Sequence, residues 1–134
     1  MCGVALVVPL KFYELYVFMS EKTVFKKIID KEVPSRIVYE DDLCLAFHDV
    51  ASQAPVHVLI IPKTTELRSL NDIDDGNSAL IAHIFSLIPK LARELGIADE
   101  GYRVVANCGV NACQTVPHLH FHILGGRGFA WPPG

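Results

Sequence analysis

Three histidines alternate with large apolar residues near the end of the chain. His118, His120 and His122 are separated by single apolar residues within 118–124. Alternation with period two is typical of a strand, so we expect all three imidazoles on one face of a strand over 118–124. At a rise of roughly 3.3 Å per residue, neighbouring rings would start about 6.6 Å apart, close enough to surround one small anion. Such a row suits either metal binding or nucleophilic catalysis at phosphorus.

The polar residues that accompany the row favour phosphate over metal. Asn107, Gln114 and Thr115 are neutral donors, which suit phosphate oxygens and are unusual zinc ligands. His57 lies in another apolar segment, and Asp49 ends a further one, where a carboxylate suits ribose hydroxyls or caps a loop. We therefore expect a phosphate site without metal. A zinc site and a row of histidines with no task are the alternatives.

Apolar periodicity predicts the elements that must position these residues. The first helix starts at Val24 behind capping oxygens and ends before Pro34. A second helix covers 78–95, with the apolar face Leu80, Ile81, Ile84, Phe85, Ile88, Leu91 and Leu95, and with His83 on its surface. Strands are predicted over 36–40, 43–48, 56–61, 102–106 and 118–124. Strand pairs with tight turns and no βαβ alternation imply an α+β fold with an antiparallel sheet.

Composition narrows the class of protein. The 134 residues form one domain by length, 51% are hydrophobic, and the net charge is −3. No basic stripe is present, so we expect no nucleic-acid partner. The four cysteines, Cys2, Cys44, Cys108 and Cys113, show neither a disulfide framework nor zinc-knuckle spacing. We therefore expect reduced thiols and an intracellular protein.

Residues 1–19 are more apolar than the rest of the chain. They lack the charge order of a signal peptide and are too interrupted for a membrane span, so no membrane partner is expected. The predicted organisation is an apolar N-terminal extension of unknown role over 1–19 and one domain over 20–134.

The motif at 118–124 resembles the signature of the histidine triad (HIT) superfamily. Further segments are similar to its histidine triad nucleotide-binding protein branch, namely residues 25–29, 39–42, 45–49, 53–55, 125–127 and 131–134. The resemblance implies a HIT-like fold, in which a five-stranded antiparallel sheet with two helices dimerises into a continuous ten-stranded sheet.

The same resemblance implies an activity. It is that of a purine nucleoside phosphoramidase, which cleaves the P–N bond of adenosine phosphoramidates through a nucleotidyl-histidine intermediate. The implied protein requires no cofactor, takes purine nucleotides such as AMP or GMP, and is a cytoplasmic homodimer, also nuclear if the source is eukaryotic. The alternatives are a dinucleoside polyphosphate hydrolase and a non-catalytic nucleotide-binding scaffold dimer.

The resemblance also implies residue roles. His120 would be the nucleophile, His122 and Thr115 would contact the phosphate or leaving group, and His118 with His57 would complete the relay by sharing one proton. The implied nucleotide-binding residues are Phe25, Ile28, Val33, Phe47, His48, Asp49, Val50, Asn107, Gln114 and Trp131. Thr115 replaces the commoner serine and Cys113 lies near the phosphate, which makes the leaving group harder to infer than the reaction.

Overall fold

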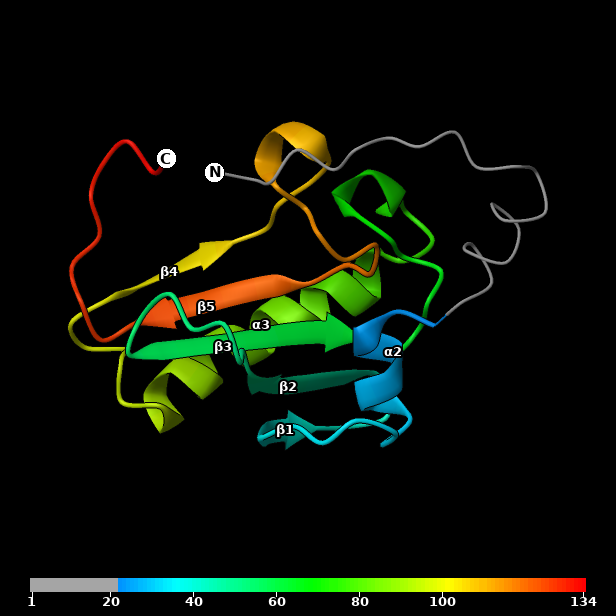
Figure 1. The fold of residues 1–134 in the computed structure, drawn as a ribbon, viewed down its shortest axis with the longest axis horizontal. Helices are drawn as coiled ribbons and strands as arrows, with labels where there is room; N and C mark the ends of the chain where they lie inside the picture. Colours follow the sequence, from blue (N-terminus) through cyan, green and yellow to red (C-terminus); the bar gives the residue numbers. More distant parts are fainter. Residues whose placement is uncertain (1–21) are drawn as a thin grey trace.

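A five-stranded antiparallel sheet organises the chain, whose computed structural model describes residues 22–134 (Figure 1). Its strands are β1 (Ile37–Glu40), β2 (Cys44–His48), β3 (Val56–Pro62), β4 (Tyr102–Val105) and β5 (Phe121–Gly125), in the order β1-β2-β3-β5-β4. The helices of this region are α2 (Val24–Ile29) and α3 (Ser78–Glu94), with 3-10 turns η1 (Leu70–Asp72) and η2 (Val110–Ala112). The predicted α+β fold is confirmed, and the expectation for 1–19 lies outside the described residues.

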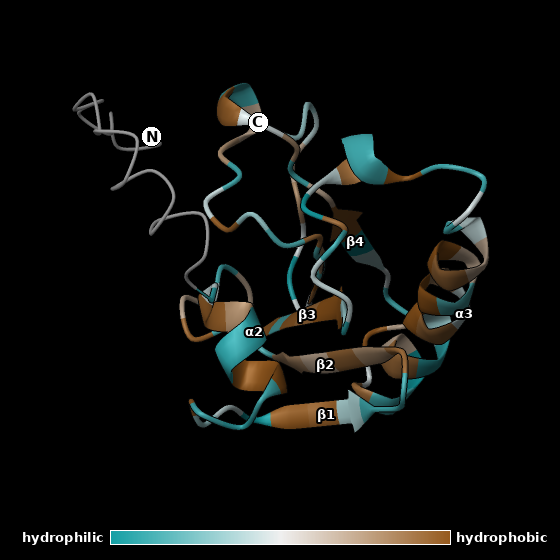
Figure 2. Ribbon diagram, turned by 90° about the vertical axis from the view of Figure 1, so that its right-hand side faces the viewer, coloured by the Kyte–Doolittle hydropathy of each residue, from teal (hydrophilic) through white to brown (hydrophobic). Residues whose placement is uncertain are grey.

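The two helices cover opposite faces of the sheet (Figure 2). Alternation along the central strands divides the buried side chains accordingly. Cys44 and Ala46 of β2 belong to the core under α3, whereas Leu45 and Phe47 belong to the core under α2. The sheet therefore has a large core on one face and a small core on the other. No helix within 22–134 is long and apolar enough to cross a membrane.

Helix α2 is a short helix with a capped start and an early end. The Thr23 side chain accepts a hydrogen bond from the Lys26 N–H at 3.1 Å, which fixes the start. The helix ends at Ile29, earlier than predicted, and Lys31 then takes a left-handed backbone conformation with φ 61°. Phe25 and Ile28, three residues apart, form its buried face.

Helix α3 matches its prediction in extent, and its buried face differs in detail. Ile84, Ile88 and Leu91 are buried as predicted, but Phe85 is 48% exposed and Leu87 is buried instead. The predicted apolar stripe was therefore slightly displaced around the helix. This difference leaves the orientation of α3 toward the sheet unchanged.

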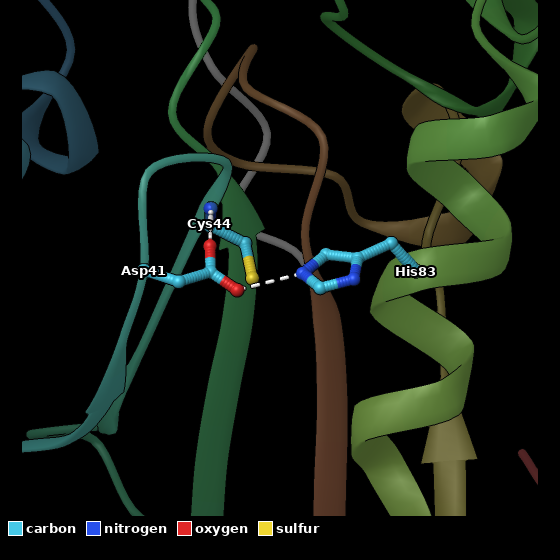
Figure 3. A group of neighbouring side chains, drawn as sticks. All are labelled: Asp41, Cys44 and His83. Carbon is cyan, nitrogen blue, oxygen red and sulfur yellow. Dashed lines mark hydrogen bonds and ion pairs between the residues drawn. The ribbon is translucent and has the colours of Figure 1, made fainter.

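His83, predicted to lie on the surface, connects α3 to the β1–β2 hairpin (Figure 3). Its Nε2 donates to Asp41 Oδ2 at 2.6 Å, and the Tyr39 hydroxyl donates to the same oxygen at 2.8 Å. The other oxygen of Asp41 accepts the backbone N–H groups of Leu43 and Cys44. A carboxylate has about four acceptor sites, and here all are used. The His83 side chain is 32% exposed and is at the same time hydrogen-bonded to the hairpin.

The same saturation argues against a metal at this cluster. The ligand atoms of Asp41, Cys44 and His83 lie within 4.8 Å of one another. However, Asp41 has no free lone pair, and burial raises the pKa of the Cys44 thiol to about 12. The cluster is therefore best described as a hydrogen-bonded clamp between helix and hairpin.

Candidate active site

The three histidines lie where β5 begins. The ladder of β5 starts at Phe121, so His118 and His120 precede the strand that was predicted to contain them. The Leu119 N–H donates to the Leu67 carbonyl, so it is not available to the β3–β5 ladder. Phe121 and the other apolar members of the row still pack in the core under α3. His120 and His122 therefore face the α2 side.

His120 is held as a neutral imidazole. Its Nδ1 lies 2.7 Å from the His118 carbonyl, which can only accept, so Nδ1 carries the proton and Nε2 keeps a lone pair. The edge of Phe25 packs against its ring, with centroids 5.0 Å apart. Burial lowers the pKa of His120, opposed by that backbone hydrogen bond. The His118 carbonyl thus fixes the tautomer, and Nε2 is free to act as a nucleophile.

His57 pairs with His122, and not with His118 as expected. The Gln53 N–H donates to His57 Nδ1 at 3.0 Å, so the proton of His57 is on Nε2. That Nε2–H donates to His122 Nδ1 at 2.8 Å, which places the proton of His122 on its own Nε2. Burial, then His120 and His57, lower the pKa of His122 to about 4. Burial also lowers the pKa of His57.

The strand register explains the different partner. His57 faces Leu124 in the β3–β5 ladder, which makes His122 its diagonal neighbour. His118 lies near the other end of β3, where its Nε2 donates to the Pro62 carbonyl at 2.7 Å. Its side chain is 1% exposed, and burial lowers its pKa. The proposed proton sharing between His118 and His57 was therefore wrong.

Asp49 caps its loop with one carboxylate oxygen and approaches His57 with the other. Oδ1 accepts the Ala51 N–H at 2.8 Å, which caps the loop. Oδ2 lies 3.4 Å from His57 Nε2. Its side chain is 18% exposed, so one oxygen remains near the solvent-facing part of the site.

A pocket of about 310 Å³ lies between α2 and the histidines. Its walls include seven of the ten residues expected to bind the nucleotide, namely Phe25, Ile28, Val33, Phe47, His48, Asp49 and Val50. Thr115, His120 and His122 also line this pocket. A second, more open pocket of about 610 Å³ shares His48, Asp49 and Val50 and reaches His57. The structure thus brings the predicted recognition and chemical groups together.

Three predicted nucleotide-binding residues do not line either pocket. Gln114 braces its own loop, because its Oε1 accepts the Gly109 N–H and its Nε2 donates to the carbonyls of Arg68 and Val116. That assignment was wrong, since no donor of Gln114 is left for phosphate. Asn107 follows β4 outside both pockets, and Trp131 is 83% exposed in the C-terminal tail.

One residue of the pocket wall was missed. Ser35 lines both pockets, and its Oγ is buried without a hydrogen-bond partner. A short polar residue after Pro34 gives no signal in the sequence beyond that of a turn. Ser35 is therefore a candidate contact for a polar group of the ligand.

The three cysteines of the described region lie outside both pockets. Cys44 and Cys108 are free thiols, as expected. Cys113 is disulfide-bonded, so the expectation of reduced thiols is not met at that position.

Comparison with known proteins finds relatives that match most of the chain. The family model of the HIT domain matches residues 30–129. An uncharacterized HIT-like protein of Synechococcus elongatus is 53% identical over 116 residues, covering 87% of this chain and all of that protein. A 14 kDa zinc-binding protein of Zea mays is 46% identical over 113 residues, covering 84% of this chain and 88% of that protein.

Solved structures give the same result. A HIT family hydrolase from Legionella pneumophila superposes with a TM-score of 0.81 at 44% identity, covering 84% of this chain and all of that chain. A histidine triad nucleotide-binding protein from Candida albicans superposes with a TM-score of 0.69 at 34% identity, covering 84% and 85%. The chain therefore belongs to the HIT domain family of hydrolases and nucleotide-binding proteins.

Proposed function

We propose that the protein is a purine nucleoside phosphoramidase that hydrolyses the P–N bond of adenosine phosphoramidates. The observation that carries the proposal is the 2.7 Å hydrogen bond from His120 Nδ1 to the His118 carbonyl, which leaves the Nε2 lone pair available at the pocket. A buried neutral imidazole is a competent nucleophile at neutral pH, because it need not lose a proton first. In this proposal His120 Nε2 is the nucleophile that attacks phosphorus.

The proposed reaction has two steps. His120 Nε2 attacks phosphorus as the P–N bond breaks, and the leaving nitrogen takes one proton from solvent and departs as an amine. Water then attacks the nucleotidyl-histidine, placing its hydroxyl on phosphorus and returning one proton to solvent, which releases AMP and neutral His120. The His122 Nε2–H would donate to a phosphoryl oxygen, and Thr115 lines the same pocket.

The pocket composition supports a purine nucleotide ligand. Its walls near α2 are apolar, so the base would be held mainly by contact with Phe25, Ile28 and Phe47, with little selection between adenine and guanine. Asp49 would accept the ribose hydroxyls. The dinucleoside polyphosphate hydrolase and the scaffold dimer remain the competing functions, and turnover separates them.

We further propose that catalysis needs no metal. The maize relative is named for zinc, and the ligand atoms of Asp49, His57 and His122 lie within 4.8 Å of one another. However, His57 Nδ1 and His122 Nδ1 both accept hydrogen bonds, so a metal between these rings would displace the proton that joins them. Dialysis against a strong chelator should leave the turnover rate unchanged; a large loss restored by zinc would contradict the proposal.

The proposed assembly is a cytoplasmic homodimer. Strand β4 ends the sheet order, so within 22–134 its outer edge has no strand partner. Such an edge can pair with a second copy to give a ten-stranded sheet. Light scattering on the eluted protein should give twice the chain mass of 14.8 kDa; a monomer at micromolar concentration would exclude this arrangement.

Replacement of His120 by Ala tests the activity. His120→Ala should abolish hydrolysis of an adenosine phosphoramidate while retaining AMP binding, and quenched wild-type enzyme should gain the mass of one nucleotidyl group. His83→Gln, which changes a histidine outside the pocket, should retain full activity and serves as the control. Full activity in His120→Ala would refute the mechanism. Faster cleavage of a dinucleoside polyphosphate by the wild type would favour the competing hydrolase.

A further inference from the structure

Arg127 binds the 51–55 loop, which precedes β3 and contacts the His57 ring through Gln53. It lies in the exposed segment after β5, and its Nε and Nη2 donate to the Gln53 carbonyl at 3.2 and 3.0 Å. Its Nη1 donates to the Gly128 carbonyl at 2.9 Å, and its Cζ lies 4.2 Å from the centroid of the Phe129 ring. All three guanidinium nitrogens are thus engaged by the backbone, and Arg127 lines neither pocket.

The Gln53 backbone connects this arginine to the histidines. Its carbonyl accepts from Arg127, while its N–H donates to His57 Nδ1 at 3.0 Å. Further bonds stiffen the loop, since the Gln53 side chain donates to the Ala51 carbonyl at 2.9 Å. The tail also packs closely, because a Cβ on Gly126 would lie 2.9 Å from Pro55. The position of the Gln53 N–H therefore depends on the tail that carries Arg127.

The proton on each imidazole follows from that N–H. A donor facing His57 Nδ1 requires the proton of His57 to be on Nε2, and His122 Nδ1 then accepts it. His122, which lines the pocket, therefore offers a donor, its Nε2–H, to a phosphate bound there. If the Gln53 N–H moved away, His57 could carry its proton on Nδ1. His122 would then donate from Nδ1 and present a lone pair to anionic phosphoryl oxygens.

We propose that Arg127 is a positioning residue that sets the tautomers of His57 and His122 through the backbone of Gln53. The inference rests on the proposed function for its catalytic consequence, although the tautomers themselves belong to the free protein. For metal-ligating histidines, loss of the outer hydrogen-bond partner costs roughly 10–100-fold in affinity or activity, and we expect an effect of similar order for these imidazoles. Loss of the arginine should act on kcat more than on KM, because the base and ribose walls are untouched.

The test compares Arg127→Gln with a matched control, Arg103→Gln. Arg103 contacts the same Phe129 ring, with its Cζ 5.1 Å from the centroid, and donates to the Ala130 carbonyl, but it has no bond to the 51–55 loop. Long-range ¹⁵N–¹H NMR spectra of the free protein report which ring nitrogen is protonated. The proposal predicts mixed tautomers for His57 and His122 in Arg127→Gln and wild-type tautomers in Arg103→Gln.

Turnover of an adenosine phosphoramidate gives the second readout. In Arg127→Gln we expect kcat to fall by about tenfold or more with KM changed much less, and Arg127→Lys, which keeps one donor, should recover part of the loss. Arg127→Lys also serves if Arg127→Gln fails to fold. Wild-type tautomers in both Arg127 variants would overturn the inference. Altered tautomers together with an inactive wild type would instead refute the proposed function and leave the positioning role standing.

Discussion

Acid should destabilise this protein in part through the imidazole of His122. Burial and two neighbouring imidazoles lower its pKa from 6.5 to about 4 in the folded state. The unfolded state then binds more protons than the folded state between these two values, so the free energy of unfolding rises with pH in that window. The stability that neutral His122 contributes is complete above pH 6.5 and is lost as the pH falls toward 4.

The magnitude follows from the shift. At about 1.36 kcal/mol per pKa unit, a change from 6.5 to about 4 corresponds to about 3 kcal/mol. His122 is only partly buried, and solvent screening reduces this value, so we expect about 1.5–2 kcal/mol from this residue.

Urea unfolding of wild type and His122→Gln at constant ionic strength measures the effect. Glutamine does not titrate, so the difference in unfolding free energy between the two proteins should change by about 1.5–2 kcal/mol between pH 7.5 and 4. The buried imidazole of His118 is present in both proteins and cancels to first order. His57 and His120 interact with His122, so the measured difference includes their coupling to it. Between pH 7.5 and 8.5 the two curves should run parallel. Equal pH slopes across the acid window would refute the electrostatic account of His122.

Three further predictions concern single side chains. Asp49→Ala should weaken binding of AMP strongly and of its deoxy analogue much less by calorimetry; equal losses would show that Asp49 only caps its loop. Asp41→Asn should lower the free energy of unfolding by about 1.5–3 kcal/mol because a saturated carboxylate loses its charge, and an unchanged urea midpoint would contradict the clamp. Gly126→Ala should destabilise by roughly 1–2 kcal/mol, since φ is 86° and the new Cβ would lie 2.9 Å from Pro55. Gly128→Ala, where a Cβ meets nothing within 4 Å, should leave the melting temperature unchanged.

Periodicity predicted the sheet well because it reports which face a side chain occupies. Leu45 and Phe47 lie on the α2 face, and His120 and His122 share that face, as the alternation implied. Periodicity does not report which residues of two distant strands lie opposite each other. The His57–His122 pair joins positions 65 residues apart, and only the β3–β5 register determines it.

Hydrogen-bond saturation was also invisible in the sequence. Gln114 has the chemistry of a phosphate donor, yet the neighbouring backbone uses its amide completely. His83 has the helical position of a surface residue, yet Asp41 lies opposite it after the hairpin has formed. Residue type predicts what a side chain can bind, whereas the assembled fold decides which partner is available.

The short helix α2 links substrate preference to the stability of the fold. Phe25 and Ile28 are its buried residues, and both are at once core and pocket wall. A substitution that reshapes the base pocket there also removes packing from the smaller face of the sheet. Ser35 and Val50 line the pocket but belong to neither core, so divergence in ligand choice can accumulate at these positions without weakening the domain.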